Sequence, residues 1–368
     1  MRHFEYYLFE NFDPDEQTDN PDNPRNFLNI HTDPVLTQII EQPNDSAAYT
    51  GYSDTDLIHK LLNGGVLRMD KNQLMFDCPI FLREDAAVLS HEVAVHACFL
   101  TDLLEQRMPD IIKICSKIKN GFSEQLNLYH ILCGMIFDGS FFNFLSDKGI
   151  LSTSRLHPSG LDYLTVIYEK CGELQTFSNN LLCSYNRFVN DRCSLQSFGD
   201  ANGNRFDFYR FCRLLETRKL PSDFRRAESL WIQGNFDKNS LLLEVVSLVQ
   251  TGYCCPEALY LLEVFGYAKN GKICVPIYTP QEKSIIADIE NIVEHTLGDA
   301  ISQTLMELSG SLQITSVRHG VDWLEIANEL YHILFGTINQ QLVDRKLVSE
   351  PQFFPGQGRY SKCIEIYV

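Results

Sequence analysis

The sequence holds 368 residues, 44% of them hydrophobic and 21% charged, a balance that is typical of globular proteins and excludes an intrinsically disordered chain. Its 31 basic and 48 acidic residues give a net charge of −17. This charge argues against nucleic-acid binding by the surface as a whole, because phosphate contacts need clustered lysine and arginine. No stretch approaches about 18 uninterrupted apolar residues, the N-terminus lacks a secretory pattern, and the 12 cysteines show no disulfide spacing, so we expect a cytoplasmic protein without a membrane span.

The first 50 residues are strongly acidic. They hold ten acidic residues against Arg2 and Arg25, together with five prolines. Proline and unbalanced charge disfavour packed structure, so residues 11–25 are predicted to form a solvated loop. The length of the whole chain suits two or three domains.

Two stretches of the chain are nearly identical. Residues 128–134 read LYHILCG, and residues 330–336 read LYHILFG, with six of seven positions the same. Ahead of them, the runs around Pro79 and Pro276 also match and lie 197 residues apart. A third block follows each copy, from Leu151 to Tyr163 in the first and from Val348 to Tyr360 in the second, again 197 residues apart. Three blocks in one order predict an internal duplication.

Each copy carries the pattern of a hairpin followed by a long helix. In the second copy Asn270–Gly271 lies between two short β-prone runs, and both residues tolerate the positive φ of a tight turn. Lys71–Asn72 lies at the matching place in the first copy. Apolar residues at helical spacing from Ile285 to Leu308 predict an amphipathic helix of about seven turns. The matching helix runs from Val88 to Ile114, with a break expected at Pro109.

A helix that leads into a β-hairpin, with further helices before it, resembles the winged-helix (helix-turn-helix) arrangement of bacterial regulatory proteins. The C-terminus fits this pattern best. Residues 339–348 would be the helix and first strand, Pro355–Gly358 the wing tip, and residues 359–364 the returning strand. The resemblance covers about two thirds of the chain at the level of pattern.

This resemblance implies a mainly α fold with β-hairpins, of the α+β class, built from a tandem duplication of winged-helix-like modules. We predict a first winged-helix-like half at residues 1–169 and a second at residues 221–368. Residues 170–220 would be a helical, basic connecting segment.

In a winged-helix protein the helix before the wing enters the major groove, and cations of the wing contact the DNA backbone. The C-terminal module offers six candidates for these contacts: Asn339, Gln340, Arg345, Lys346, Arg359 and Lys362. Residues 339–368 total only +1, so a solvated hairpin explains these residues equally well.

The most basic stretch, residues 205–226, lies between the copies and totals +4, with aromatic residues interleaved. It offers seven candidates for a nucleic-acid patch: Arg205, Arg210, Arg213, Arg218, Lys219, Arg225 and Arg226. The alternative is an interdomain segment that pairs with acidic faces of both halves.

Two motifs resemble metal sites but depart from the required geometry. In HEVAVH, His91 and His96 lie five residues apart, about 140° around a helix instead of the about 40° that a shared zinc ion needs. The run from Asp200 resembles a calcium loop, but Arg210 stands where a bidentate glutamate belongs.

His130 and His332 hold equivalent places in the two copies. Their apolar neighbours favour histidines packed near a core over a ligand pair. We therefore predict no metal, no cofactor and no catalytic residue, and the sequence leaves open whether the cluster of His91, Glu92 and His96 has a role.

The sequence favours a non-enzymatic transcriptional regulator that binds double-stranded DNA. The alternative is a protein-interaction module whose winged-helix-like domains do not bind DNA, which the acidic charge and the acid-bearing helix at Pro256–Phe265 favour. An enzyme with its site between the halves is the third hypothesis. The apolar faces of the long helices either pack within the chain or form a homodimer, and the sequence leaves both open.

Overall fold

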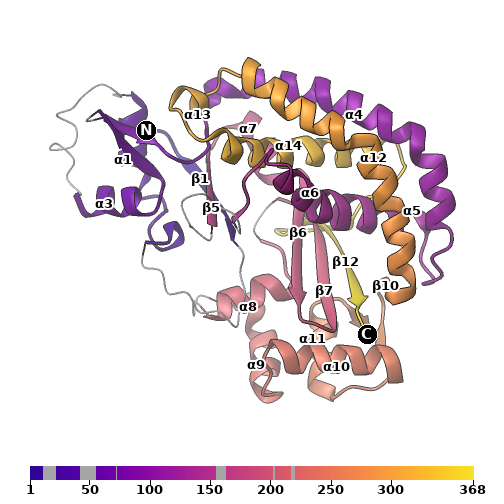
Figure 1. The fold of residues 1–368 in the computed structure, drawn as a ribbon. Coiled ribbons are helices and arrows are strands. Elements are labelled where there is room, and N and C mark those ends of the chain that lie inside the picture. Colours follow the sequence, from indigo (N-terminus) through magenta and orange to yellow (C-terminus); the bar gives the residue numbers. More distant parts are fainter. Residues whose placement is uncertain (11–21, 42–54, 72, 155–162, 202–203, 217–219) are drawn as a thin grey trace. The chain divides into compact units, whose positions relative to one another are not determined.

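The computed structural model describes residues 1–10, 22–41, 55–71, 73–154, 163–201, 204–216 and 220–368 (Figure 1). The fold is α+β, as predicted: long helices accompany several small sheets. The chain forms two units, each assembled from three segments. Unit 1 holds Met1–Phe99, Asn143–Asn179 and Asp299–Thr337, and unit 2 holds Leu100–Phe142, Asn180–Gly298 and Ile338–Val368. Each unit is described by itself below.

Unit 1 contains a three-stranded sheet in the order β1-β5-β4. Strand β5 (Tyr163–Glu169) is buried along its whole length and is the middle strand. It pairs antiparallel with β1 (Phe4–Glu10) and parallel with β4 (Ile80–Phe81), with Ile80 opposite Ile167. A separate hairpin, β2 (Leu67–Asp70) and β3 (Gln73–Phe76), follows helix α3.

Unit 1 also contains helical elements. They are η1 (Pro24–Asn26), α1 (Asp33–Glu41), α3 (Thr55–Asn63), η2 (Arg83–Asp85), the start of α4 (Ala86–Cys115), most of α6 (Phe141–Asp147), α7 (Gly172–Asn179), the end of α12 (Pro280–Ser311), α13 (Thr315–Arg318) and the start of α14 (Trp323–Asp344). Of the loop predicted at 11–25, residues 11–21 lie outside the described part of the chain, and η1 begins at Pro24, with Asn23 as its cap.

Unit 2 contains a five-stranded sheet, whose long strands β6 (Leu182–Val189), β7 (Cys193–Asp200) and β12 (Gly358–Ile366) lie side by side (Figure 1). Strand β12 pairs antiparallel with β7 and with the short β11 (Phe353–Phe354), and parallel with β10 (Ile277–Tyr278). The hairpin predicted at the C-terminus therefore forms. Its returning strand, however, is an interior strand of a sheet rather than a free wing.

The helical elements of unit 2 begin with the rest of α4 and with α5 (Glu124–Leu128). They continue with the π-helix η3 (Tyr129–Ser140), α8 (Phe208–Glu216), η5 (Ser222–Phe224), α9 (Arg225–Gln233), α10 (Lys238–Thr251), α11 (Pro256–Val264), the start of α12 and the end of α14. Residues 170–220, predicted as a helical connecting segment, instead include the β6–β7 hairpin, whose strands are largely buried.

Helices α9, α10 and α11 gather at one end of the unit 2 strands (Figure 1). Asp237 caps α10 by accepting from the Ser240 amide at 2.7 Å, and Gly252 ends it with a φ of 79° that favours glycine. Pro256 starts α11 at a position where its missing amide costs nothing. The hairpin of β8 (Ala268–Lys269) and β9 (Lys272–Ile273) follows, turning at Asn270–Gly271 with positive φ, as predicted.

The same local pattern occurs in both units. The Ile167 amide donates to the Pro79 carbonyl at 2.9 Å, and 197 residues later the Ile364 amide donates to the Pro276 carbonyl at 2.9 Å. The parallel pairs Ile80–Ile167 and Ile277–Ile364 repeat with the same displacement. A carboxylate near the start of each long helix that follows, Asp85 just before α4 and Glu282 in the first turn of α12, accepts from the amide three residues earlier.

Helix α4 continues through Pro109, so the predicted break is wrong. Proline removes one hydrogen bond, and a long helix buried along one face retains enough of the others to continue. The apolar stripe of α12 is buried at 0–1% exposure at Ile289, Val293, Leu297, Ile301, Leu305 and Leu308, so it packs within the chain. That stripe is not available to a second copy.

Two helical stretches among the described residues are long and apolar enough to cross a bilayer by length and composition alone. They are Arg83–Cys115 and Glu124–Asp147. In the second stretch, 61% of the most apolar window is buried inside the structure, as in a core helix; in the first, only 33% is. Helix α4 therefore leaves much of its apolar surface uncovered.

Candidate functional site

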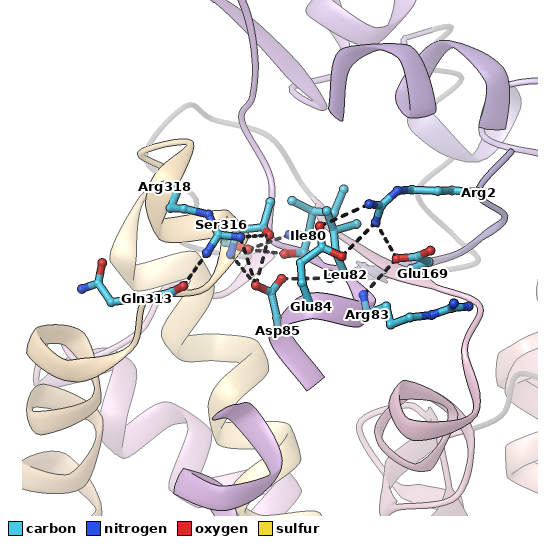
Figure 2. Close-up of polar contacts among 11 residues, drawn as sticks. Arg2, Ile80, Leu82, Arg83, Glu84, Asp85, Glu169, Gln313, Ser316 and Arg318 are labelled. Atoms are coloured by element: carbon cyan, nitrogen blue, oxygen red, sulfur yellow. Dashed lines mark hydrogen bonds and ion pairs between the residues drawn. The ribbon is translucent and has the colours of Figure 1, made fainter. Parts of the chain in front are cut away.

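One polar network of unit 1 begins at Arg2. Arg2 donates from Nη1 to Glu84 Oε2 at 3.0 Å and to Glu169 Oε2 at 2.8 Å (Figure 2). Glu169, at the end of β5, also accepts from the Arg83 amide at 2.9 Å. The side chain of Glu169 is 8% exposed, so Arg2 neutralises a buried carboxylate and connects the residue stretch before β1 with β5 and η2.

Asp85 is the second centre of this network. Its Oδ2 accepts from the Leu82 amide at 2.9 Å, and its Oδ1 accepts from the Thr315 amide at 2.9 Å and the Thr315 hydroxyl at 3.1 Å. Arg318 reaches the same Oδ1 at 3.3 Å (Figure 2). Burial raises the pKa of Asp85, while these hydrogen bonds oppose the rise. With both carboxylate oxygens of Asp85 engaged, the network is suited to joining α4 to α13 rather than to chemistry.

A second buried group in unit 1 is Glu329 on α14. The Tyr168 hydroxyl donates to its Oε1, while its Oε2 is buried without a hydrogen-bond partner, 3.8 Å from His332 Nδ1. The ring of His332 stacks on Phe9 with centroids 4.4 Å apart. Burial raises the pKa of Glu329 to about 8 and lowers the pKa of His332 to about 4. At neutral pH this cluster is therefore largely uncharged.

Replacing Glu329 by Gln should change how stability depends on pH. Between pH 4.5 and about 8 the folded chain holds a proton on Glu329 that the unfolded chain has lost, so this group makes stability fall as pH rises. The Glu329→Gln variant should lose a slope of up to about 1.4 kcal/mol per pH unit between pH 6.5 and 8. Urea unfolding at several pH values measures it. Glu294→Gln, at an exposed position of α12, is the control. A slope equal to that of the parent would contradict the expectation.

In unit 2, His130 lies in the π-helix and is 2% exposed. Its Nε2 is 3.0 Å from Ser361 Oγ on β12, and burial lowers its pKa to about 3. A histidine so weakly basic is a poor general base, so this serine–histidine contact is best suited to packing. π-Helical turns are often found at functional positions, but the sequence carries no signal that separates η3 from an ordinary helix.

Two of the six DNA-contact candidates are buried. Asn339 is fully buried and donates to the Leu182 carbonyl at 2.7 Å. Lys362 is 8% exposed and donates to the carbonyls of Phe206 (3.0 Å) and Phe265, and burial lowers its pKa to about 8. Neither side chain can reach DNA in this structure, because each satisfies backbone groups inside unit 2.

Three of the remaining candidates are engaged in other contacts. Arg359 pairs with Asp200 at 2.8 Å and also bonds Gln340 Oε1 at 2.8 Å. Arg345 pairs with two acidic residues of α4, Asp102 among them at 2.8 Å. The sixth candidate, Lys346, is exposed in a left-handed conformation just after α14. DNA contact by these four stays a prediction.

The five basic-patch candidates that the structure describes do not share one surface. Arg205 is 2% exposed and donates to the Ser184 carbonyl at 2.6 Å, so it belongs to the interior of unit 2. Arg210 and Arg213 are half-buried, and Arg225 and Arg226 are exposed. The other two candidates, Arg218 and Lys219, lie outside the described residues.

The motifs that resemble metal sites do not assemble one among the described residues, where no group of three metal-ligating side chains occurs. His91 is exposed, and His96 faces Thr304 Oγ1 at 3.5 Å. The carboxylate of Asp200 accepts from Arg359. His130 and His332 lie in different units.

Sequence reasoning missed one surface, on α11 and the turn before it. Tyr253, in the turn before α11, is 80% exposed, and Tyr260 on α11 is 48% exposed. Glu257 and Glu263 flank Tyr260 on the same helix, and Glu263 also accepts from the Gly271 amide at 2.8 Å. Two exposed tyrosines beside acidic residues are better suited to protein contact than to phosphate contact. No protein-family model, curated protein or solved structure matches this chain.

Proposed function

We propose that the chain is a non-enzymatic regulatory protein that binds another protein through the surface of α11 and the turn before it. We infer that α9, α10, α11 and the β8–β9 hairpin form a winged-helix-like module, with α10 and α11 as the helix-turn-helix and the hairpin as the wing. The order of the elements supports this, as do the capped turn at Gly252 and the hairpin turn at Asn270–Gly271.

We further propose that the module is the second copy of an internal duplication. In the first copy, α3 and the β2–β3 hairpin likewise precede a parallel strand pair, β4 with β5, and a capped long helix, α4. The displacement of 197 residues between equivalent backbone hydrogen bonds supports a common origin of the two halves.

One observation carries the choice of protein over DNA. The helix that would enter the major groove, Pro256–Val264, has two glutamates and no lysine or arginine. Major-groove binding needs cations near the phosphates and donors at the base edges, which α11 does not offer. Its exposed tyrosine is instead a side chain enriched in protein interfaces.

DNA binding is the second candidate, and a specific observation favours it. Arg225 and Arg226 at the start of α9 and Lys269 and Lys272 of the hairpin are all exposed, so cations flank the module. These four residues, rather than the buried Asn339, are where contact with phosphates would occur.

A photo-crosslinking experiment tests the proposal. The full chain, with benzoylphenylalanine in place of Tyr260, is produced in the cells in which the protein naturally occurs and is illuminated there. It should form a crosslinked adduct that resists nuclease and is degraded by protease. The same group at exposed Asn291 on α12 is the control and should yield no such adduct. An adduct that nuclease removes, or equal yields at both positions, would contradict protein binding by α11.

Fluorescence anisotropy with mixed-sequence duplex DNA tests the second candidate. We expect no micromolar binding at low salt. Micromolar binding that weakens steeply with salt, and that is lost when Arg225, Arg226, Lys269 and Lys272 are replaced by Ala, would favour DNA instead.

A further inference from the structure

Helix α4 carries an exposed apolar face in unit 1. Val88 is 36% exposed, and Val95 and Phe99 are each 54% exposed. Their spacing of seven and four residues aligns them along one side of the helix. Ala87, Ala94 and Cys98 are also exposed beside them. We call the surface of these six residues the α4 face.

The α4 face is separate from the side of the helix that packs into unit 1. Leu89, Val93 and Ala97 lie on the opposite side and are buried at 0–2% exposure. A helix whose inner side already supplies the core normally has a polar outer side. Apart from the exposed His91 between Val88 and Val95, the exposed residues on this side are apolar or small, which indicates a surface that is covered by something else.

Charge on and beside the α4 face indicates what covers it. From Ala86 to Phe99 the chain has no lysine or arginine, and Glu92 is the only charged residue there. Helix α12 lies beside α4, since His96 Nδ1 is 3.5 Å from Thr304 Oγ1. Its segment Asp299–Ser311 also lacks cations and exposes Met306 and Glu307.

We propose that the α4 face binds a basic amphipathic helix of another protein. A partner helix with apolar residues every three to four positions would cover Val88, Val95 and Phe99, and lysines or arginines at its edges would face Glu92 and Glu307. Ala87, Ala94 and Cys98 are small enough to let its backbone approach closely. This surface lies in unit 1, so the inference does not rest on the function proposed for α11.

The same charges disfavour two other occupants. A second copy of this chain would bring the same glutamates beside its α4 face and a net charge of −17. A membrane with anionic lipids would repel a face that has no cations to contact the headgroups. Both occupants are outcomes of the test below.

The test uses the full chain and two fluorescein-labelled peptides. Both repeat leucine at helical spacing; one has lysine and the other glutamate at all remaining positions. Anisotropy should show that the lysine peptide binds at least about tenfold more tightly than the glutamate peptide at low salt. A Val95→Ser/Phe99→Ser variant should bind the lysine peptide at least about tenfold more weakly.

Ile232→Ser, on α9 at a 67% exposed position, is the matched control and should bind like the parent. Thermal unfolding confirms that each variant folds. Equal binding of both peptides, or unchanged binding by the double variant, would overturn the proposal. Two other results would also overturn it, if the double variant abolishes them: dimerisation of the parent chain in sedimentation velocity, or pelleting of the parent chain with vesicles of phosphatidylcholine and phosphatidylglycerol.

Discussion

Replacing Asp85 by Ala should lower the free energy of unfolding of unit 1 by about 3–5 kcal/mol. Asp85 is 1% exposed and accepts from two backbone amides, those of Leu82 and Thr315. Without the carboxylate both donors remain buried and lack an acceptor, which costs more than the hydrogen bonds themselves contributed. The variant also loses the charge that Arg318 faces.

The two tryptophans make this measurement specific. Trp323 lies in unit 1 and Trp231 in unit 2, so a Trp231→Phe background leaves tryptophan fluorescence, excited selectively over tyrosine, from unit 1 alone. In that background, urea unfolding should show a large decrease of the midpoint for Asp85→Ala and a smaller one for Asp85→Asn, which keeps an acceptor oxygen. Arg318→Ala should cost no more than about 1 kcal/mol, because its side chain is 51% exposed. An effect of Asp85→Ala as small as that of Arg318→Ala would refute the role assigned to Asp85.

Replacing His130 by Gln should flatten the loss of stability in acid. Burial lowers the pKa of His130 from 6.5 to about 3, so between these values the unfolded chain binds a proton that the folded chain does not. Its contribution to stability is therefore fully present above pH 6.5 and decreases as the pH falls. Removing the imidazole should reduce the slope of unfolding free energy against pH by up to about 1.4 kcal/mol per unit between pH 4 and 6.5.

The slope, and not the absolute stability, is the quantity to compare, because the His130→Gln substitution also changes the contact with Ser361. A Trp323→Phe background confines the fluorescence signal to unit 2. His295→Gln, at an exposed position on α12, is the matched control and should keep the slope of the parent. An unchanged slope for His130→Gln would show that His130 is protonated in the folded chain, contrary to the expectation.

Local patterns in the sequence predicted much of the secondary structure. The apolar spacing from Ile285 to Leu308 lies within one helix, and Asn270–Gly271 forms a hairpin turn. These features depend on neighbours a few residues away, which a single sequence displays directly. The break expected at Pro109 was wrong, because the packing of a long helix outweighed the local cost of one proline.

The candidate site residues were harder to predict. Composition alone made Asn339, Arg359 and Lys362 look like surface groups available to DNA. Asn339 instead bonds the Leu182 carbonyl, 157 residues earlier in the chain, and Arg359 pairs with Asp200, 159 residues earlier. Such partners lie too far away in the chain for any local pattern to reveal them.

The sequence by itself determined the α+β class, the main helices, the hairpin turn at Asn270–Gly271 and the acidic charge, because each follows from composition or from residues close together in the chain. Only the tertiary structure decided which polar groups are buried and which apolar faces stay exposed. Both α4 and α12 bury an apolar stripe, yet α4 also exposes Val95 and Phe99 on its outer side. Burial depends on what packs against a residue, and that packing brings together segments that are distant in the chain.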